Sequence, residues 1–220
     1  GRAWHTPQGN LAATNLTILD LPPTVAATLG FVAGLSLDDA LRRLAPSLQT
    51  ATGLDWAAGD DNRDRLRLKW PNDVLLDGRK LAGILLEASS LADARLAVAT
   101  GIGVNVGSAP TGLPYPAVSI AELGITITAQ DLFEALSDAW AVHARIWDEG
   151  RGFPLIRKQW LDRAAGLGAD VAVTVGGEVF AGVFETIDPE GRLIIRAGDG
   201  GRRTISAGEV HFGTVATARP

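Results

Sequence analysis

Four side chains around residues 69–80 have the types and the spacing to do chemistry: Lys69, Asn72, Asp73 and Lys80. They surround an Asp77-Gly78 pair between two alternating apolar runs, which is one of the strongest local signals for a β-hairpin. A lysine ammonium suits a phosphate or a developing negative charge, and a neighbouring carboxylate suits Mg²⁺. An isolated basic strand face is more often simply solvated. A hairpin alone does not require four such groups at one turn, whereas an anion-binding site does.

Two glycines extend this pattern. Gly83 lies inside the second run of the hairpin, and Gly103 lies between Gly101 and Asn105 at the end of another predicted strand. A glycine inside a strand weakens it, and it often marks a place where a ligand or another backbone approaches closely. A Gly-x-Gly alone indicates a bend more often than a site. Together with the hairpin, it predicts a flat ligand lying across the sheet.

The start of the chain offers the guanidinium of Arg2 and the indole of Trp4. Such a pair could bind phosphate and stack on a nucleobase. The alternative is a frayed terminus whose aromatic side chain packs against the protein. The three histidines are scattered, with His143 on the apolar face of a predicted helix and His5 and His211 apart from it, so they predict no zinc site.

Composition argues against several classes of function. The 220 residues are 46% hydrophobic with a net charge of −5, so the chain can bury a sizeable core but has no basic footprint for nucleic acid or an anionic membrane. No run approaches the roughly 18 apolar residues of a membrane span, and no signal-peptide pattern is present. The absence of cysteine excludes thiolate catalysis, and it fits a cytoplasmic protein. No Gly-x-Ser-x-Gly elbow and no P-loop is found.

Hydrophobic periodicity predicts the elements that must position these residues. The predicted helices cover 25–44 with Thr24 as N-cap, 128–147 with a capping box of Thr128 and Asp131, and 153–164. The predicted strands of the first part cover 10–19, 66–70, 80–86 and 96–106, with an exposed loop over 46–65 and a helical turn at 118–123. Short strands between glycine-rich turns follow at 171–175, 179–187, 193–196, 202–206 and 209–212. This change of pattern predicts a small barrel-like β domain after a boundary near 165–168.

The motif segments together resemble a known family. KWPND (69–73), KLAGILLE (80–87) and GIGVN (101–105), in this order and spacing, resemble the catalytic domain of biotin–protein ligases. The opening GRAWHTPQGN resembles the end of that family's biotin-binding loop, and residues 188–210 resemble its small SH3-like barrel. The resemblance implies an α+β fold, with a mixed β-sheet and packed helices in a class II synthetase-like catalytic domain over 1–166. It implies an SH3-like C-terminal β-barrel over 167–220.

The resemblance also implies an activity and a role for each matching residue. The family joins biotin and Mg-ATP into biotinyl-5′-AMP and then transfers the biotinyl group to a carrier lysine. Lys80 matches the lysine at the biotin carboxylate, and Gly83 and Gly103 match backbone beside the biotin. The residues that match the family's ATP-binding positions are Arg2, Trp4, Lys69, Asn72, Asp73 and Asn105. Of these, Asp73 and Asn105 also match positions that bind Mg²⁺. The catalytic residues implied are Lys80, Lys69 and Arg2.

The implied chemistry agrees with the residue types. A carboxylate that attacks a phosphate faces repulsion between two anions, so catalysis consists mostly of positioning and charge neutralisation. No side-chain nucleophile is needed. The implied partner is the biotin carboxyl carrier domain of acetyl-CoA carboxylase or another biotin-dependent carboxylase, and an exposed sheet edge could also serve a homodimer. These residues contain no match to a DNA-binding winged helix, so they give no support for a repressor role.

Two alternatives compete with a biotin ligase. One is a non-catalytic module that binds biotin or the carrier protein without activating biotin, although the intact set of lysines, asparagine and aspartate argues against such decay. The other is a lipoate or octanoyl ligase relative, which shares the broad fold. The KWPND–KLAG pair favours biotin.

The sequence also predicts a limit on the activity of these 220 residues alone. The chain opens at Gly1 and contains no methionine. The family's upstream strand, its Thr-Asn segment for the biotin ring and the first part of its Gly/Arg loop have no counterpart here. We therefore expect residues 1–220 alone to show little or no turnover in a biotinyl-transfer assay. Robust turnover by this chain would contradict the prediction.

Overall fold

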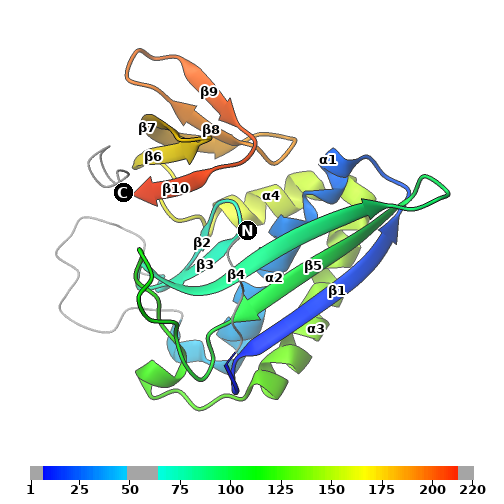
Figure 1. The fold of residues 1–220 in the computed structure, drawn as a ribbon, viewed down its shortest axis with the longest axis vertical. Helices are drawn as coiled ribbons and strands as arrows, with labels where there is room; N and C mark the ends of the chain where they lie inside the picture. The colour runs from blue at the N-terminus through cyan, green and yellow to red at the C-terminus, as the bar shows by residue number, and fades with distance from the viewer. Residues whose placement is uncertain (1–6, 49–63, 213–220) are drawn as a thin grey trace.

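A five-stranded sheet carries all three motif segments, and helices cover one of its faces (Figure 1). The computed structural model describes residues 7–48 and 64–212. The strands are β1 (Leu11–Leu19), β2 (Leu66–Lys69), β3 (Asp73–Leu76), β4 (Arg79–Ser90) and β5 (Leu96–Val104), in the order β1-β5-β4-β3-β2. Every pairing between these strands is antiparallel. Parallel pairing in the described part of the chain comes from two isolated bridges, Leu68 with Ala164 and Lys80 with Ala117.

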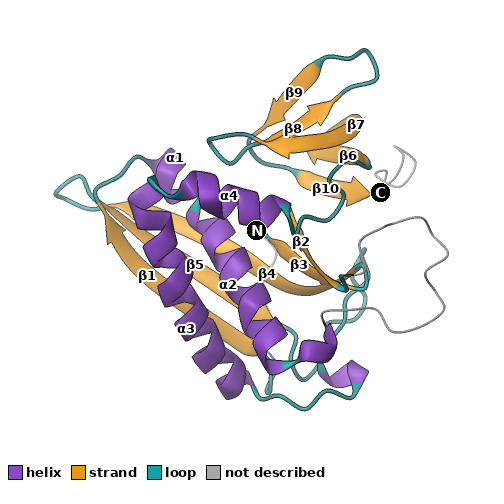
Figure 2. Ribbon diagram, turned by 180° about the vertical axis from the view of Figure 1, so that it is seen from behind, coloured by secondary structure: helices purple, strands orange, loops and turns teal. Residues whose placement is uncertain are grey.

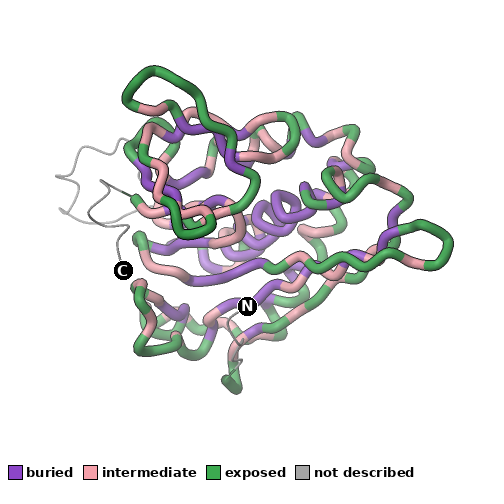
Figure 3. The backbone as a smooth tube through the Cα atoms, turned by 45° about the horizontal axis from the view of Figure 1, so that its top comes forward, coloured by how far each residue is buried: buried purple, intermediate pink, exposed green. Residues whose placement is uncertain are grey.

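The helices lie together on one side of this sheet (Figure 2). They are α1 (Pro23–Ala26), α2 (Leu29–Leu44), α3 (Ala129–Trp147) and α4 (Phe153–Leu161), with short 3₁₀ turns at Pro46–Leu48, Ala121–Leu123 and Asp148–Gly150. Helix α2 packs against β2 to β5, and α3 packs against α2 and β1. Buried residues gather between the sheet and these helices, which leaves the opposite sheet face available for a site (Figure 3).

The first predicted helix is divided in two. Pro23 occupies the first position of α1 and Pro22 precedes it, so the prediction of Thr24 as N-cap is wrong. Proline suits that position because its φ is preset and the N–H it lacks would have no acceptor within the helix. A separate helix, α2, then begins at Leu29. The hydroxyl of Thr28 donates to Val25 O at 2.6 Å where the two helices meet.

The segment Pro23–Leu44 corrects a second expectation. By length and composition it could cross a membrane, with a mean hydropathy of 1.3, although the sequence analysis predicted no such run. However, 78% of this window is buried inside the protein. Helix α2 packs against β2 to β5 and against the helices α3 and α4, so its apolar surface is that of a core helix.

The C-terminal strands form a second antiparallel sheet. They are β6 (Asp170–Val175), β7 (Glu178–Ile187), β8 (Leu193–Arg196), β9 (Arg202–Ile205) and β10 (Glu209–Phe212), in the order β10-β6-β7-β8-β9. This arrangement is consistent with the SH3-like unit expected from the sequence. Within residues 164–212, β9 and β10 are not paired, so backbone hydrogen bonds do not close the sheet into a barrel.

The second sheet is fastened to the first unit by its β7–β8 turn. Trp70 Nε1 donates to Gly191 O at 3.1 Å, and Arg157 Nε donates to Ile187 O at 2.5 Å. Gly191 has φ +81°, and a Cβ built there would lie 3.0 Å from the ring of Phe31. Glycine is therefore required both by the backbone conformation and by the close approach to α2. These contacts bring the second sheet next to the motif segments.

The capping box of α3 gives a test of the fold. Thr128 Oγ1 accepts from Asp131 N at 3.0 Å, and Asp131 Oδ2 accepts from Thr128 N at 3.0 Å, as predicted. We expect Thr128→Ala to lower the free energy of unfolding by about 1 kcal/mol. The N–H of Asp131 loses its acceptor, and the side chain of Asp131 is no longer held in place to accept from the N–H of residue 128. Urea denaturation measures the change, with Thr128→Ser as the control that keeps the hydroxyl. An unchanged transition midpoint in Thr128→Ala would contradict the assigned cap.

Candidate active site

Strand register brings the three motif segments into one row across the sheet. Lys69 on β2 lies opposite Asp73 on β3, Asp73 lies opposite Gly83 on β4, and Gly83 lies opposite Gly103 on β5. Residues directly opposite one another in a sheet share a face. The row ends at Ala12 on β1, opposite Gly103. The site therefore has charged groups at one end and a floor without long side chains at the other.

A β-bulge is needed to bring Lys80 to this face. Val74 pairs with Ala82, but Leu75 pairs with Lys80, so Leu81 is an extra residue on β4. Strand side chains alternate between faces, and without the extra residue Lys80 would face away from Gly83. The bulge restores Lys80 to the face of Asp73, while Leu81 is fully buried in the core. Bulges re-aim side chains in this way beside active sites.

Tight turns hold the hairpin that carries Lys80. Asp77 and Gly78 have φ values of +50° and +73°, as a two-residue type I′ turn requires, so the predicted Asp-Gly turn is present. It joins β4 to β3, a strand that the sequence analysis did not predict and that separates the runs 66–70 and 80–86. Asp73 and Lys80 are thereby held on adjacent strands. The preceding turn contains a cis Trp70–Pro71 bond, and Asn72 O accepts from Ile84 N at 2.8 Å.

Lys80 is fixed along its backbone and at its ammonium group. Its N–H donates to Pro116 O at 2.9 Å, and its carbonyl accepts from Val118 N at 3.0 Å. Its Nζ lies 2.6 Å from Asp73 Oδ1 and 5.4 Å from the centroid of the Tyr115 ring. The side chains of Lys80 and Asp73 are 26% and 24% exposed, so the pair is open to a ligand on one side.

Asn105 contributes to the same arrangement through the backbone. Its Nδ2 donates to Lys80 O at 3.4 Å and to Val118 O at 3.2 Å. Its own N–H donates to Leu81 O at 3.0 Å, beside the bulge. The amide group of Asn105 therefore braces the segment that holds Lys80.

Two clefts meet at Lys80. The larger has a volume of about 450 Å³ and is lined by residues 69–73, Gly78 and Lys80, by residues 114–116 and by residues 208–212 of the second sheet. The smaller has a volume of about 150 Å³ and is lined by residues 80–83, by Gly103 and Asn105, and by the loop that contains Leu113 and Tyr115. Lys80 and Tyr115 line both clefts. A molecule in one cleft and a molecule in the other would therefore meet at the ammonium of Lys80.

Lys69 also lines the larger cleft. Burial lowers its pKa below the usual lysine range, the charge of Lys80 lowers it further, and the carboxylates of Asp73 and Glu209 oppose both effects. Its Nζ lies 5.8 Å from the centroid of the Phe212 ring. The larger cleft thus contains two ammonium groups, which can bind an anion, and two carboxylates, Asp73 and Glu209.

The structure brings together most of the predicted site residues. Lys69, Asn72, Asp73 and Lys80 line the larger cleft, and Lys80, Gly83, Gly103 and Asn105 line the smaller one. Arg2 and Trp4, like the loop 49–63, lie outside the described residues. No group of three or more acidic or histidine side chains that could hold a metal occurs in residues 7–48 and 64–212.

Sequence reasoning missed four residues of the cleft walls: Tyr115, Glu209, His211 and Phe212. Tyr115 lies in a proline-rich loop, and its place beside Lys80 depends on a backbone bridge that has no local sequence signal. The other three come from β10, more than a hundred residues from the hairpin, and reach it only through the docking of the second sheet. The sequence predicted these three residues only as part of the last strand, 209–212, and nothing in that strand indicates a binding site.

Two family descriptions match the chain. The Biotin/lipoate A/B protein ligase family matches residues 1–105, and the Biotin protein ligase C terminal domain matches residues 166–213. The fold is similar to that of the solved biotin protein ligase from Aquifex aeolicus in complex with biotin and ATP. That comparison has a TM-score of 0.72 at 22% identity and covers 96% of this chain and 81% of the other.

Two curated relatives are similar over nearly the whole chain. A biotin–[acetyl-CoA-carboxylase] ligase of Paracoccus denitrificans is 41% identical over 219 residues, covering 97% of this chain and 84% of the relative. A second ligase of the same name, from Mycobacterium tuberculosis, is 30% identical, covering 96% of this chain and 72% of the relative. With the motif row and the two clefts at Lys80, these matches show that the chain belongs to the biotin–[acetyl-CoA-carboxylase] ligase family.

Proposed function

We propose that the protein activates biotin with ATP as biotinyl-5′-AMP and transfers the biotinyl group to a lysine of a biotin carboxyl carrier protein. The observation that carries the proposal is the position of Lys80 where two clefts meet. The smaller cleft, floored by Gly83 and Gly103, suits the flat ring system and chain of biotin. The larger cleft, with Lys69 and Lys80, suits the triphosphate of ATP.

The first step joins two anions. An oxygen of the biotin carboxylate attacks the α-phosphorus, the bond to the bridging oxygen breaks, and pyrophosphate leaves. Lys80 lies between the two reactants and reduces their repulsion, while Lys69 holds the phosphates that leave. Fixed charges in a partly enclosed site stabilise such a transition state without reorganisation at the moment of reaction. In the second step the carrier lysine attacks the acyl carbon, and AMP leaves.

The larger cleft also provides a place for Mg²⁺ on the nucleotide. Magnesium in nucleotide sites is commonly held by one or two carboxylates together with phosphates and water. Asp73 offers a half-buried carboxylate beside both lysines, which fits this mode, and a bound ion would neutralise phosphate charge. The amide nitrogen of Asn105 is engaged by two backbone carbonyls, so we propose that Asn105 acts mainly by holding Lys80.

Further assignments belong to the same proposal. Arg2 would bind phosphate, Trp4 would cover the adenine, and Asn72 would contact the nucleotide, as the family resemblance implies. We propose a catalytic domain over 1–166 and a C-terminal domain over 167–220, which fits the two separate sheets.

ATP dependence and the absence of cysteine support a cytoplasmic location. The outer edge of β1, where Leu16 is 68% exposed, is a place for a second subunit or the carrier to pair.

The reaction is tested by pyrophosphate exchange and carrier biotinylation with the product of the complete open reading frame that encodes residues 1–220. We expect biotin-dependent exchange, which lipoate does not support. Lys80→Met should lower the rate at least about 100-fold, because a charge that stabilises the transition state is lost. The control Lys158→Met removes an exposed lysine of α4 that pairs only on the surface with Asp162, and it should keep full activity. Binding of biotin without exchange would instead support a non-catalytic module, and exchange with lipoate would support the lipoate relatives.

The lowered pKa of Lys69 predicts how nucleotide affinity depends on pH. Burial lowers the pKa of Lys69 in the free protein. A bound triphosphate favours the charged lysine, so we expect this pKa to rise when ATP binds. Binding should therefore be strongest below the pKa of free Lys69 and weaken as the pH rises through that value. Calorimetric titration with ATP between about pH 7 and pH 10 measures the profile. Lys69→Arg, which stays charged, should flatten the alkaline decline, and identical profiles for both proteins would contradict this role.

A further inference from the structure

The outermost strand of the catalytic sheet is completed by the segment that leads to the second sheet. Strand β2 has four residues and pairs with β3 on one side. On its other side, Leu68 N donates to Arg163 O at 2.9 Å, and Ala165 N donates to Leu68 O at 2.8 Å. Leu68 immediately precedes Lys69. The position of Lys69 therefore depends on where residues 163–165 are held.

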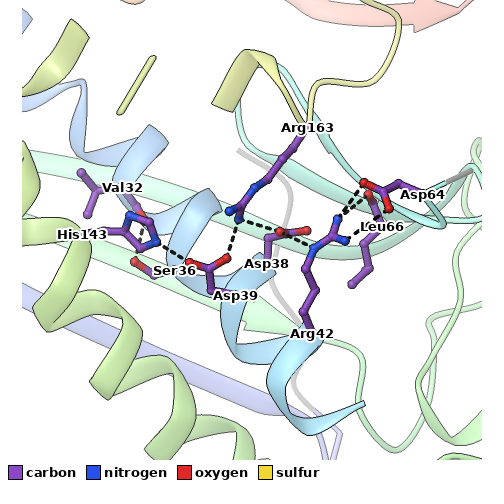
Figure 4. A network of polar contacts seen from close by, with 9 residues as sticks. All are labelled: Val32, Ser36, Asp38, Asp39, Arg42, Asp64, Leu66, His143 and Arg163. Atoms are coloured by element: carbon purple, nitrogen blue, oxygen red, sulfur yellow. Dashed lines mark hydrogen bonds and ion pairs between the residues drawn. The ribbon is translucent and has the colours of Figure 1, made fainter. Parts of the chain in front are cut away.

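Arg163 holds this segment to α2 by its side chain. Its Nη1 lies 2.7 Å from Asp38 Oδ2 and 2.6 Å from Asp39 Oδ1 (Figure 4). One residue thus binds β2 through its carbonyl and α2 through its guanidinium. Because both contacts belong to one residue, the ion pairs with α2 restrain the backbone that pairs with Leu68.

The carboxylates that hold Arg163 belong to a larger network (Figure 4). Asp38 is fully buried, and its Oδ2 also accepts from Arg42 Nε at 2.7 Å. Arg42 in turn donates to Leu66 O at 3.3 Å, at the start of β2. Asp39 Oδ2 lies 2.7 Å from His143 Nε2 on α3. A buried carboxylate requires charged or hydrogen-bonding partners. The partners of Asp38 are Arg163 and Arg42, and both also bind the backbone of β2, at Leu68 and at Leu66.

We infer that Arg163 is a positioning residue for the ATP side of the site. It sets the place of Lys69 on β2 and, because the second sheet follows directly, the place of Glu209 and Phe212 in the opposite wall of the larger cleft. The smaller cleft is built on β4 and β5, which are internal strands with partners on both sides. Loss of Arg163 therefore disturbs the use of ATP more than the use of biotin. This inference rests on the proposed function, which assigns ATP to the larger cleft.

The test compares two substitutions of Arg163 with a matched control, each in the product of the complete open reading frame. Arg163→Met removes the charge, and Arg163→Lys keeps a positive charge on a side chain of similar length. The control Arg43→Met removes an arginine of α2, the helix that carries Asp38 and Asp39; its exposed ion pair with Asp138 contacts neither β2 nor the 163–165 segment. Steady-state pyrophosphate exchange gives kcat and KM separately for ATP and for biotin.

We expect Arg163→Met to raise the KM for ATP, and thereby to lower kcat/KM for ATP about 10- to 100-fold, the loss that follows a misplacement of binding groups by roughly 1 Å. The KM for biotin should stay within about twofold, because the smaller cleft is not displaced. Arg163→Lys should recover most of the loss, and Arg43→Met should match the unsubstituted protein. A merely structural role would reduce the amount of active protein without separating the two substrates, and that result would overturn the inference.

A second measurement covers the case in which Arg163→Met is too unstable for kinetics. Amide hydrogen exchange followed at Leu68 and Ala165 should be faster in Arg163→Met than in Arg43→Met, while exchange in β5 stays unchanged. Equal protection of Leu68 and Ala165 in these two variants would overturn the inference. If the unsubstituted protein shows no biotin-dependent exchange of pyrophosphate, the proposed function fails instead, and the hydrogen-exchange result still decides whether Arg163 holds β2.

Discussion

The site depends on a constraint of strand parity at Lys80. Lys80 and Gly83 are three residues apart, so a regular strand would place them on opposite faces of the sheet. The extra residue Leu81 lets Lys80 share a face with Asp73 and Gly83 while Leu81 fills the core. The ion pair with Asp73, the contact with Tyr115 and the meeting of the two clefts all follow from this shift. A charge-neutralising site and a well-packed core are thus built from the same strand.

The second sheet is part of the site as well as a neighbour of it. Its β10 strand supplies one wall of the larger cleft, and its β7–β8 turn is bound to Trp70, in the turn between Lys69 and Asp73. The segment that joins the sheets pairs with β2. The groups that face the larger cleft therefore come from two sheets whose relative position is fixed by a few polar contacts and by the packing of Gly191 against Phe31.

Local patterns in the sequence were sufficient for most of the elements and for the motif residues. The Asp77-Gly78 turn, the capping box of Thr128 and the short C-terminal strands each depend on neighbours in the chain, and each was predicted. The start of α1 was missed because Pro23 takes the first helical position, which places Thr24 inside the helix instead of at its N-cap. Tyr115 and Phe212 reach the site through tertiary contacts, which no local pattern records. His143 was correctly predicted to be buried, but its partner Asp39 lies on another helix.

The most direct test of the account is a crystal structure of the protein with biotin and a non-hydrolysable ATP analogue bound together. The account predicts biotin over Gly83 and Gly103, the triphosphate beside Lys69, and the carboxylate and α-phosphate both within about 3 Å of Lys80 Nζ. The wall of the larger cleft formed by Glu209 and Phe212 should contact the nucleotide. A nucleotide bound outside that cleft, or a Lys80 ammonium directed away from both reacting groups, would contradict the account.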